Sequence, residues 1–168
     1  LIERGADINA KSCEGSTAIM PAVHRNRADI VGLLISKGAK VNYAIETGYK
    51  FTPLQLACQL GHVEIVKCLL DAGARVNVTA TDGSTPLISA AFKGHHDVVQ
   101  MLLDKGANPT QRAANGMTAR EFADQFRHAE VQRVFDAYVP PKGAGKGCLV
   151  FLVAPVIGVI VVRLAMSM

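Results

Sequence analysis

The stretch TDGSTPLISAAFKGHHDVVQMLLDKGANPT, residues 81–110, contains four short signatures in order: Thr-Pro-Leu, Gly-His, Leu-Leu and Gly-Ala. Related signatures recur in this order along the chain. The threonines of the first signature are spaced by 35, 33 and 33 residues, and the glycines of the last by 33, 35 and 33: Thr17, Thr52, Thr85 and Thr118; Gly5, Gly38, Gly73 and Gly106. Two independent markers with a shared period identify an internal repeat, which indicates a repeat array.

The second full unit shows why such a repeat folds. Thr52 is expected to cap a short helix that begins at Pro53 and ends at Gly61 in the left-handed conformation. An extended finger is expected over residues 74–84. Before the finger comes a second helix over residues 62–72, with apolar residues at helical spacing: Val63, Ile65, Val66, Leu69 and Leu70. Neither helix can bury its apolar face alone, so stacked units must build the core.

These residues resemble the ankyrin repeat, and the segment 82–108 is close to the family pattern over its whole length. The resemblance implies an all-α repeat solenoid of ankyrin helix-turn-helix units with β-hairpin fingers. It covers residues 1–138 as the end of one unit, three fuller units and a last unit: 1–10, 11–45, 46–79, 80–112 and 113–138. Because the chain begins inside a unit, we expect it to be a fragment of a longer array.

Several positions depart from the family pattern. The first full unit has Ala18 for proline, Pro21 inside its first helix, and Asn26 for the helix-ending glycine. Asn tolerates a left-handed conformation, and we expect this unit to be the weakest. The family's histidine after Thr-Pro-Leu is replaced in every unit, so its usual hydrogen bonds are expected to be absent: Met20, Gln55, Ile88 and Glu121.

The last unit carries charges at positions that are apolar or glycine elsewhere. Arg120 stands where a core leucine is expected, and Arg127 replaces glycine. Charges are costly on a buried face but useful on an outermost one. The segment 113–138 is therefore interpreted as a C-terminal cap, with a degenerate, decaying repeat as the alternative.

Composition and spacing exclude several classes of function. The net charge of +4 is not concentrated in a Lys/Arg cluster, which disfavours nucleic-acid binding. No CxxC pair occurs, so zinc sites and disulfide frameworks are not expected. The segment PPKGAGKG lacks the first glycine and the final Ser or Thr of a P-loop. No nucleophile, base and orienting group come together, so we expect no enzyme, no cofactor, no metal and no small-molecule substrate.

In ankyrin arrays the family implies that protein partners bind the concave side, through finger tips and first helices. Several mapped residues are aromatic, which suits a protein-binding hot spot. The alternative is that these rings pack between units. The predicted partner-binding residues are Glu14, Ser16, His24, Arg25, Tyr49, Lys50, Phe51, Gln59, Leu60, Asp82, Ser84, Phe92, Lys93, Asn115, Met117, Gln125 and Phe126.

One interval of 35 residues places a two-residue insertion in the finger NYAIETGYKF, residues 42–51, where Lys50 also replaces the usual glycine. Insertions in a solenoid go to loops, often on the binding face. Tyr49, Lys50 and Phe51 are therefore the favoured contacts, although a tolerated loop variation would give the same pattern. Asn9 lies in a segment that resembles substrates of the asparaginyl hydroxylase, but holding the finger turn is the simpler role.

After residue 138 the composition changes. A Pro/Gly-rich linker, 139–147, precedes a hydrophobic tail, 148–168, which is predicted to be a C-terminal apolar helix and membrane anchor. Lys142 and Lys146 place its N-terminal side in the cytosol under the positive-inside rule. The alternatives are a buried or interfacial apolar extension and a non-native C-terminus from a mistaken gene model. Cys148 is a candidate for palmitoylation.

The sequence thus predicts a non-catalytic adaptor that binds a protein partner on its concave face. We expect a cytoplasmic location, with the repeats facing the cytosol if the tail anchors the chain. The main alternative is a regulatory array of a larger enzyme or channel whose other domain lies upstream. A purely structural array without a dedicated partner is the third possibility.

Overall fold

The computed structural model describes residues 7–13 and 15–140. Predictions that concern residues 1–6, Glu14 or residues 141–168, among them the hydrophobic tail and Cys148, lie outside the described residues. Within them, no helix is long and apolar enough to cross a membrane. The chain divides after Tyr138 into two compact units.

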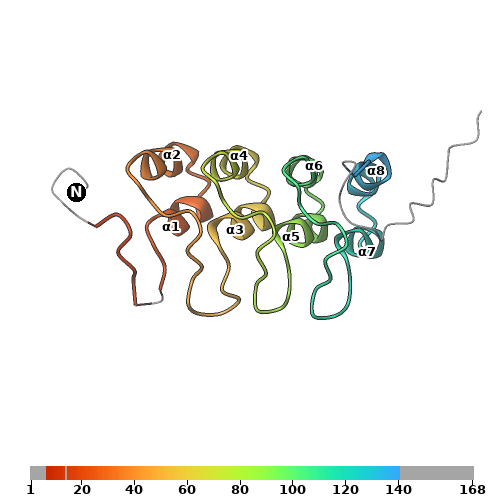
Figure 1. The fold of residues 1–168 in the computed structure, drawn as a ribbon, viewed down its shortest axis with the longest axis horizontal. Coiled ribbons are helices and arrows are strands. Elements are labelled where there is room, and N and C mark those ends of the chain that lie inside the picture. The colour runs from red at the N-terminus through yellow and green to blue at the C-terminus, as the bar shows by residue number, and fades with distance from the viewer. Residues whose placement is uncertain (1–6, 14, 141–168) are drawn as a thin grey trace, which may run out of the picture. The chain divides into compact units, whose positions relative to one another are not determined.

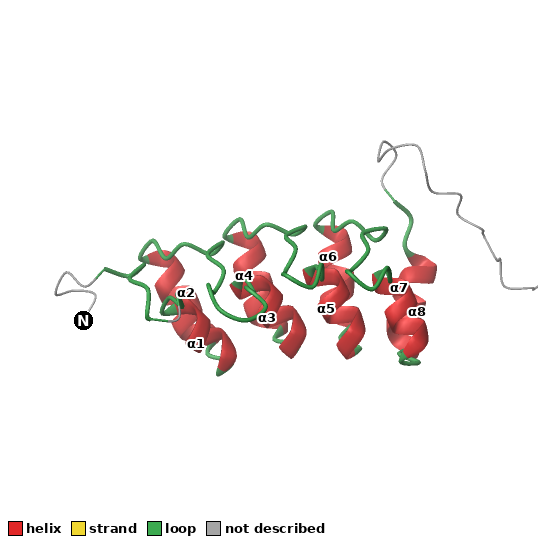
Figure 2. Ribbon diagram, turned by 90° about the horizontal axis from the view of Figure 1, so that it is seen from below, coloured by secondary structure: helices red, strands yellow, loops and turns green. Residues whose placement is uncertain are grey.

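Eight helices and no β-strand occur in the described residues, and two helices belong to each repeat. The first helices of the four units form one row and the second helices another, as Figures 1 and 2 show. Each first helix packs against its second helix and against the first helix of the next unit. This confirms the all-α solenoid. The helices are α1 (Ile19–His24), α2 (Ala28–Ser36), α3 (Pro53–Leu60), α4 (Val63–Asp71), α5 (Pro86–Lys93), α6 (His96–Asp104), α7 (Ala119–Gln125) and α8 (Ala129–Ala137).

The predicted boundaries of the first helix of the second full unit are confirmed, and its second helix is one residue shorter at each end than predicted. Thr52 caps α3 by accepting a hydrogen bond from the amide of Gln55 at 3.3 Å, and Pro53 is the first helical residue. Gly61 ends α3 with φ of 74°, a left-handed conformation that L residues rarely adopt. The same capping bond recurs at Thr85 and Thr118.

The first full unit folds differently. Ala18 has helical dihedral angles and makes no capping bond, so α1 begins only at Ile19 and is six residues long. Pro21 is its third residue, and it fits because the amides of a first turn have no partner within the helix. Asn26 takes the left-handed conformation with φ of 54°, as predicted. The hydroxyl oxygen of Thr17 is buried and has no hydrogen-bond partner in the described structure.

The core consists almost entirely of aliphatic side chains from both helix rows, including Leu54, Leu69, Leu87 and Leu102. One predicted member of the apolar stripe is wrong: Val63 is 37% exposed. It is the first residue of α4, and the buried stripe of that helix runs instead through its other four apolar residues, Ile65, Val66, Leu69 and Leu70.

The fingers are loops rather than β-hairpins. A backbone hydrogen bond closes each regular finger across four residues, as from the amide of Ala80 to the carbonyl of Ser84 at 2.9 Å. Other backbone groups bond to the neighbouring finger: Thr81 donates to Tyr49 at 3.2 Å, and Ala114 donates to Asp82 at 2.9 Å. The last finger also carries an isolated antiparallel bridge between Arg112 and Thr118, so a trace of hairpin pairing is present there.

The two-residue insertion lies where the spacing predicted it. The finger of residues 42–51 closes from the amide of Ile45 to the carbonyl of Phe51 at 3.1 Å, across six residues rather than four. Gly48 and Lys50 both have positive φ, 62° and 55°, which lets the longer loop turn.

The expected loss of the family histidine's hydrogen bonds is wrong at Gln55. Its side-chain oxygen accepts from the amide of Thr52 at 3.0 Å, and its amide donates to the carbonyl of Ser84 in the next finger at 3.0 Å. Gln55 is fully buried, so both bonds offset its desolvation. Glu121 likewise accepts from the amide of Thr118 at 2.7 Å.

The outer surface of the last unit carries charges. Arg120 is exposed and forms an ion pair with Asp136 of α8. Arg127 adopts a left-handed conformation with φ of 57° in the place of glycine. The arginine at the core-leucine position is therefore paired at the surface, and its charge is not buried.

Asn9 is bonded to the next unit. Its side-chain amide donates to the carbonyl of Gly38 at 3.2 Å, and its oxygen accepts from the amide of Lys40 at 2.8 Å. Asn42 and Asn77 repeat this bridge one and two units further along the chain. These asparagines tie consecutive units together, which is a wider role than holding one turn.

Candidate protein-binding surface

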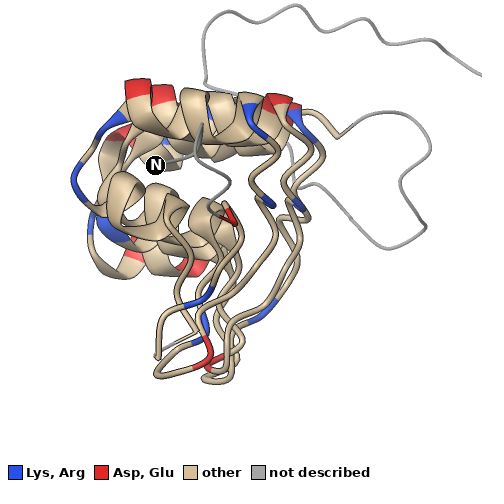
Figure 3. Cartoon of the chain, turned by 90° about the vertical axis from the view of Figure 1, so that its left-hand side faces the viewer, with Lys and Arg blue, Asp and Glu red and all other residues tan. Residues whose placement is uncertain are grey.

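The fingers and the first helices α1, α3, α5 and α7 form one side of the array, named the inner face below. Figure 3 shows the fingers projecting together from one side of the helix rows. Most of the predicted partner-binding residues lie on these elements, because the repeat places equivalent positions side by side in successive units.

Tyr49 and Phe51 lie on the finger with the insertion. Tyr49 is 60% exposed, and its ring stacks on Phe51 with centroids 5.5 Å apart. The carbonyl of Tyr49 accepts from Thr81 of the next finger. The backbone is thus held while the Tyr49 ring and the exposed Lys50 side chain face solvent.

The last two units carry an aromatic cluster, defined by Phe92, Phe122 and Phe126. Phe92 meets Phe126 edge-on at 4.8 Å between centroids and Phe122 at 5.8 Å. Phe92 is still 36% exposed and Phe126 45% exposed. Lys93 places its Nζ 5.1 Å from the centre of the Phe92 ring. The rings therefore pack between units and also present apolar surface.

Phe122 was not among the predicted residues. It occupies the repeat position four residues after the capping threonine, the position that Leu56 holds in the second full unit. Mapping this repeat position from unit to unit could have identified Phe122 as a candidate contact, since both Phe122 and Leu56 lie on the first-helix row and are only half-buried.

Some predicted residues are used by the fold itself. Ser84 is buried, and its hydroxyl donates to Asp82 at 2.6 Å. Asn115 accepts from the amide of Met117 at 3.1 Å, which stabilises the last finger. The remaining predicted positions are half-buried (Ser16, Gln59) or exposed (His24, Arg25, Leu60, Gln125), and Glu14 lies outside the described residues.

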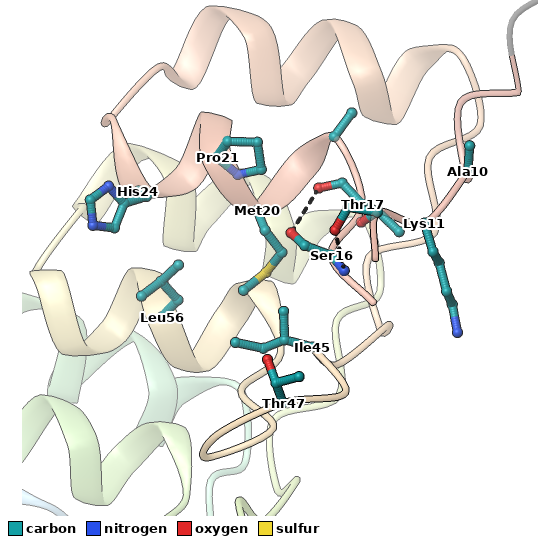
Figure 4. A pocket seen from close by; sticks show the side chains of 12 residues that line it. Ala10, Lys11, Ser16, Thr17, Met20, Pro21, His24, Ile45, Thr47 and Leu56 are labelled. Atoms are coloured by element: carbon teal, nitrogen blue, oxygen red, sulfur yellow. Dashed lines mark hydrogen bonds between the residues drawn. The ribbon is translucent and has the colours of Figure 1, made fainter. Parts of the chain in front are cut away.

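An open pocket of about 730 Å³ lies between the first two fingers and the helices α1 and α3. In Figure 4 the side chains of Met20, Ile45 and Leu56 gather around it. Of the predicted residues that the structure describes, Ser16 and His24 alone line it. The full lining is Ala10, Lys11, Ser12, Ser16, Thr17, Ala18, Met20, Pro21, His24, Ile45, Thr47 and Leu56.

The histidines of the Gly-His signature belong to the architecture. The Nε2 of His95 lies 3.2 Å from the carbonyl of Gln59, and that of His128 lies 3.0 Å from the carbonyl of Phe92. Burial, followed by the nearby His24 and His95, lowers the pKa of His62. No group of three potential metal ligands occurs among the described residues.

The stacked helix pairs and their inner face define a repeat-array protein with an extended surface and no assembled catalytic centre among the described residues. A family model described as ankyrin repeats in three copies matches residues 1–80, 44–113 and 72–134. The chain belongs to the ankyrin-repeat family.

Curated relatives match about half of the chain. It is 39% identical over 83 residues to the ankyrin repeat and KH domain-containing protein mask-1 of Caenorhabditis elegans, covering 49% of this chain and 3% of that protein. It is 38% identical over 87 residues to human ankyrin repeat and SOCS box protein 3, 51% and 17% of the two chains. It is 35% identical over 83 residues to palmitoyltransferase Hip14 of Drosophila melanogaster, 49% and 13%. The matched region is thus at most 17% of these proteins' length.

Proposed function

We propose that this chain is a non-catalytic protein-protein interaction module that binds a protein partner on its inner face. The observation that carries the proposal is the aromatic cluster, whose rings pack against one another while Phe92 and Phe126 remain 36% and 45% exposed. Ankyrin repeats are generally protein-binding modules, which supports the same function.

The physical advantage of this surface is that it is preformed. Tyr49, Phe92 and Phe126 are held by a stacked or edge-on neighbour before any partner arrives. Little side-chain entropy is therefore lost on binding, and large aromatic side chains supply contact area at low entropic cost.

The experiment compares inner and outer substitutions in the full chain. Proteins captured by the unmodified chain should be lost with Tyr49→Ala or Phe92→Ala and retained with Lys67→Ala, which alters an exposed residue of the outer helix α4. Circular dichroism melting checks that each variant is folded. Retention of every captured protein by both inner-face variants would support the purely structural alternative.

We further propose that residues 148–168 tether the module to a membrane, with the repeats on the cytosolic side. The basis is their apolar composition and the lysines that precede them, Lys142 and Lys146. Chains with and without residues 148–168 are tested for carbonate-resistant membrane association. The longer chain alone should resist extraction; if both forms are extracted, the tether is wrong.

The alternative is that the array regulates a larger enzyme or channel. One relative, named a palmitoyltransferase, contains the matched region within a much longer protein, which favours this possibility. A full-length transcript distinguishes the two, because an upstream catalytic or channel domain would assign the array a regulatory role.

A further inference from the structure

We propose that the pocket between α1, α3 and the finger of residues 42–51 takes an apolar side chain of the partner, followed in the partner's sequence by an acidic residue. This inference rests on the proposed function and assigns one part of the inner face a specific chemistry. The pocket is called the first-unit pocket below.

The first reason is that departures from the repeat pattern converge on this pocket. Ala18 stands where the next two units have Pro53 and Pro86, and Pro21 lies inside the first helix. Thr47 belongs to the inserted segment of the finger. Ala18 and Pro21 lie at the start of α1 and Thr47 lies on the next finger, and all three line the first-unit pocket.

The second reason is the apolar wall. Met20, Pro21, Ile45 and Leu56 line the pocket and come from three different elements, as Figure 4 shows. Methionine side chains adapt to ligands of varied shape because the thioether is unbranched and has three rotatable bonds. Such a wall suits one leucine-like or phenylalanine-like side chain, since ligand sites combine apolar walls with a few polar groups.

The third reason is an unused hydroxyl group. Thr17 is only 5% exposed and lines the pocket, yet its Oγ1 has no hydrogen-bond partner in the described structure. In the equivalent Thr52 and Thr85, the hydroxyl oxygen accepts the hydrogen bond that caps the following helix. A buried hydroxyl without a partner is unfavourable, so a peptide group of the ligand that bonds to Thr17 would gain affinity by satisfying it.

The fourth reason is the charge of the lining. Among the described lining residues, Lys11 and His24 are ionisable and none is acidic. Lys11 donates to Glu46 at 2.7 Å. An ammonium group has three donors, so Lys11 can bind a second carboxylate while it keeps Glu46. The remaining N–H donors of Lys11 favour a ligand whose apolar residue is next to an acidic one.

The test uses the full 168-residue chain with 13C-labelled methionine methyl groups. The probe is a blocked hexapeptide with one leucine followed by two aspartates in a glycine-serine background. The Met20 resonance should shift and saturate, while that of Met101 on the second-helix row stays in place. Replacing the leucine by serine should abolish the shift, and exchanging the aspartates for lysines should weaken binding by about twofold to fivefold.

Two variants connect the result to the pocket. Thr17→Val should weaken probe binding by about fivefold, because it removes only the hydroxyl. Ala18→Phe should prevent binding by filling the space. Thr85→Val, which alters the equivalent hydroxyl of a capped helix, should leave probe affinity unchanged. Melting curves identify any variant that fails to fold.

The inference is overturned if Met20 does not respond, if the lysine probe binds as well as the aspartate probe, or if Thr17→Val binds normally. A Met20 shift that depends on protein concentration without probe would assign the pocket to a second copy of the chain and also overturn it. In each case, partner capture that still depends on Tyr49 and Phe92 leaves the proposed function standing. Loss of that dependence overturns the proposed function separately.

Discussion

Helices α5 and α1 occupy the same place in two repeat units, yet they are built differently. Helix α5 has eight residues, is capped by Thr85, and ends at Gly94 with φ of 81°. Helix α1 has six residues and no side-chain cap, and Asn26 follows it with φ of 54°. Both nonetheless pack into the same first-helix row.

The difference shows where a repeat leaves residues free for function. In the unit of α5, Thr85, Gly94 and the following His95 are each committed to a cap, a turn or a bond to the preceding unit. In the unit of α1, the Thr17 hydroxyl makes no hydrogen bond in the described structure, and Ala18 lines an open pocket. The recurring positions of a regular unit stabilise the stacked array, whereas the irregular first unit leaves side chains available for the proposed binding pocket.

The largest predicted effect comes from Gly94→Ala. A Cβ at this position would approach the His128 ring to 2.7 Å, in addition to the strain of a positive φ. The His128 ring is held by the carbonyl of Phe92 and cannot move freely. We expect a loss of about 2–4 kcal/mol in the free energy of unfolding, measured by urea denaturation.

Two controls refine this prediction. Gly106 has a similar φ of 82° and nothing near a Cβ, so Gly106→Ala should cost only about 1 kcal/mol. Asn26→Gly in the irregular unit should change the stability by less than about 1 kcal/mol. Equal losses for Gly94→Ala and Gly106→Ala would show that packing against His128 does not matter.

A smaller loss is expected at Gln55, which links the second full unit to the third. Gln55→Leu removes the bonds to Thr52 and Ser84 while keeping the size of the side chain. The expected loss is about 1–2 kcal/mol. Ile88→Leu, at the same position of the α5 unit, breaks no hydrogen bond and should cost less. A neutral Gln55→Leu would show that these bonds add nothing to stacking.

The smallest effect concerns pH at the junctions between units. His95 bonds to the carbonyl of Gln59 in the preceding unit, whereas His62 is partly buried and interacts only weakly with the backbone of His24. Burial lowers the pKa of His62, so the unfolded chain binds its proton more readily than the folded chain. The contribution of His62 to the free energy of unfolding is therefore fully present above the ordinary imidazole pKa of about 6.5, and it is lost as the pH falls below that value.

The pH prediction is tested with His62→Gln. Urea midpoints are measured between about pH 7.5 and about pH 5.5, the range in which imidazoles titrate. The variant should lose less stability on acidification than the unmodified chain. An unchanged or steeper loss would mean that His62 does not contribute to the pH dependence.

Local features of the sequence predicted most of the fold. Thr52, Gly61 and Asn26 determine helix ends through their own backbone and capping chemistry, so their roles are visible without neighbours. The position of the insertion in residues 42–51 followed from spacing alone. The candidate contacts at Tyr49 and Phe92 came from mapping repeat positions, and they remain predictions.

Features that depend on a neighbouring unit were missed. The bond from Gln55 to Ser84 spans two units, and the bond from Thr81 to Tyr49 joins two neighbouring fingers. The first-unit pocket requires residues from two fingers and two helices. Such contacts depend on how units stack, which a pattern within one unit does not specify.

The most direct test measures stability and probe affinity in parallel for Thr17→Val and Thr85→Val. We expect opposite results for these equivalent threonines. Thr85→Val should lose about 1 kcal/mol of stability through its cap and bind the leucine-aspartate probe normally. Thr17→Val should keep its stability and bind about fivefold more weakly. If both variants lose stability alike and neither loses affinity, Thr17 has the same structural role as Thr85, and the first full unit does not provide a binding pocket.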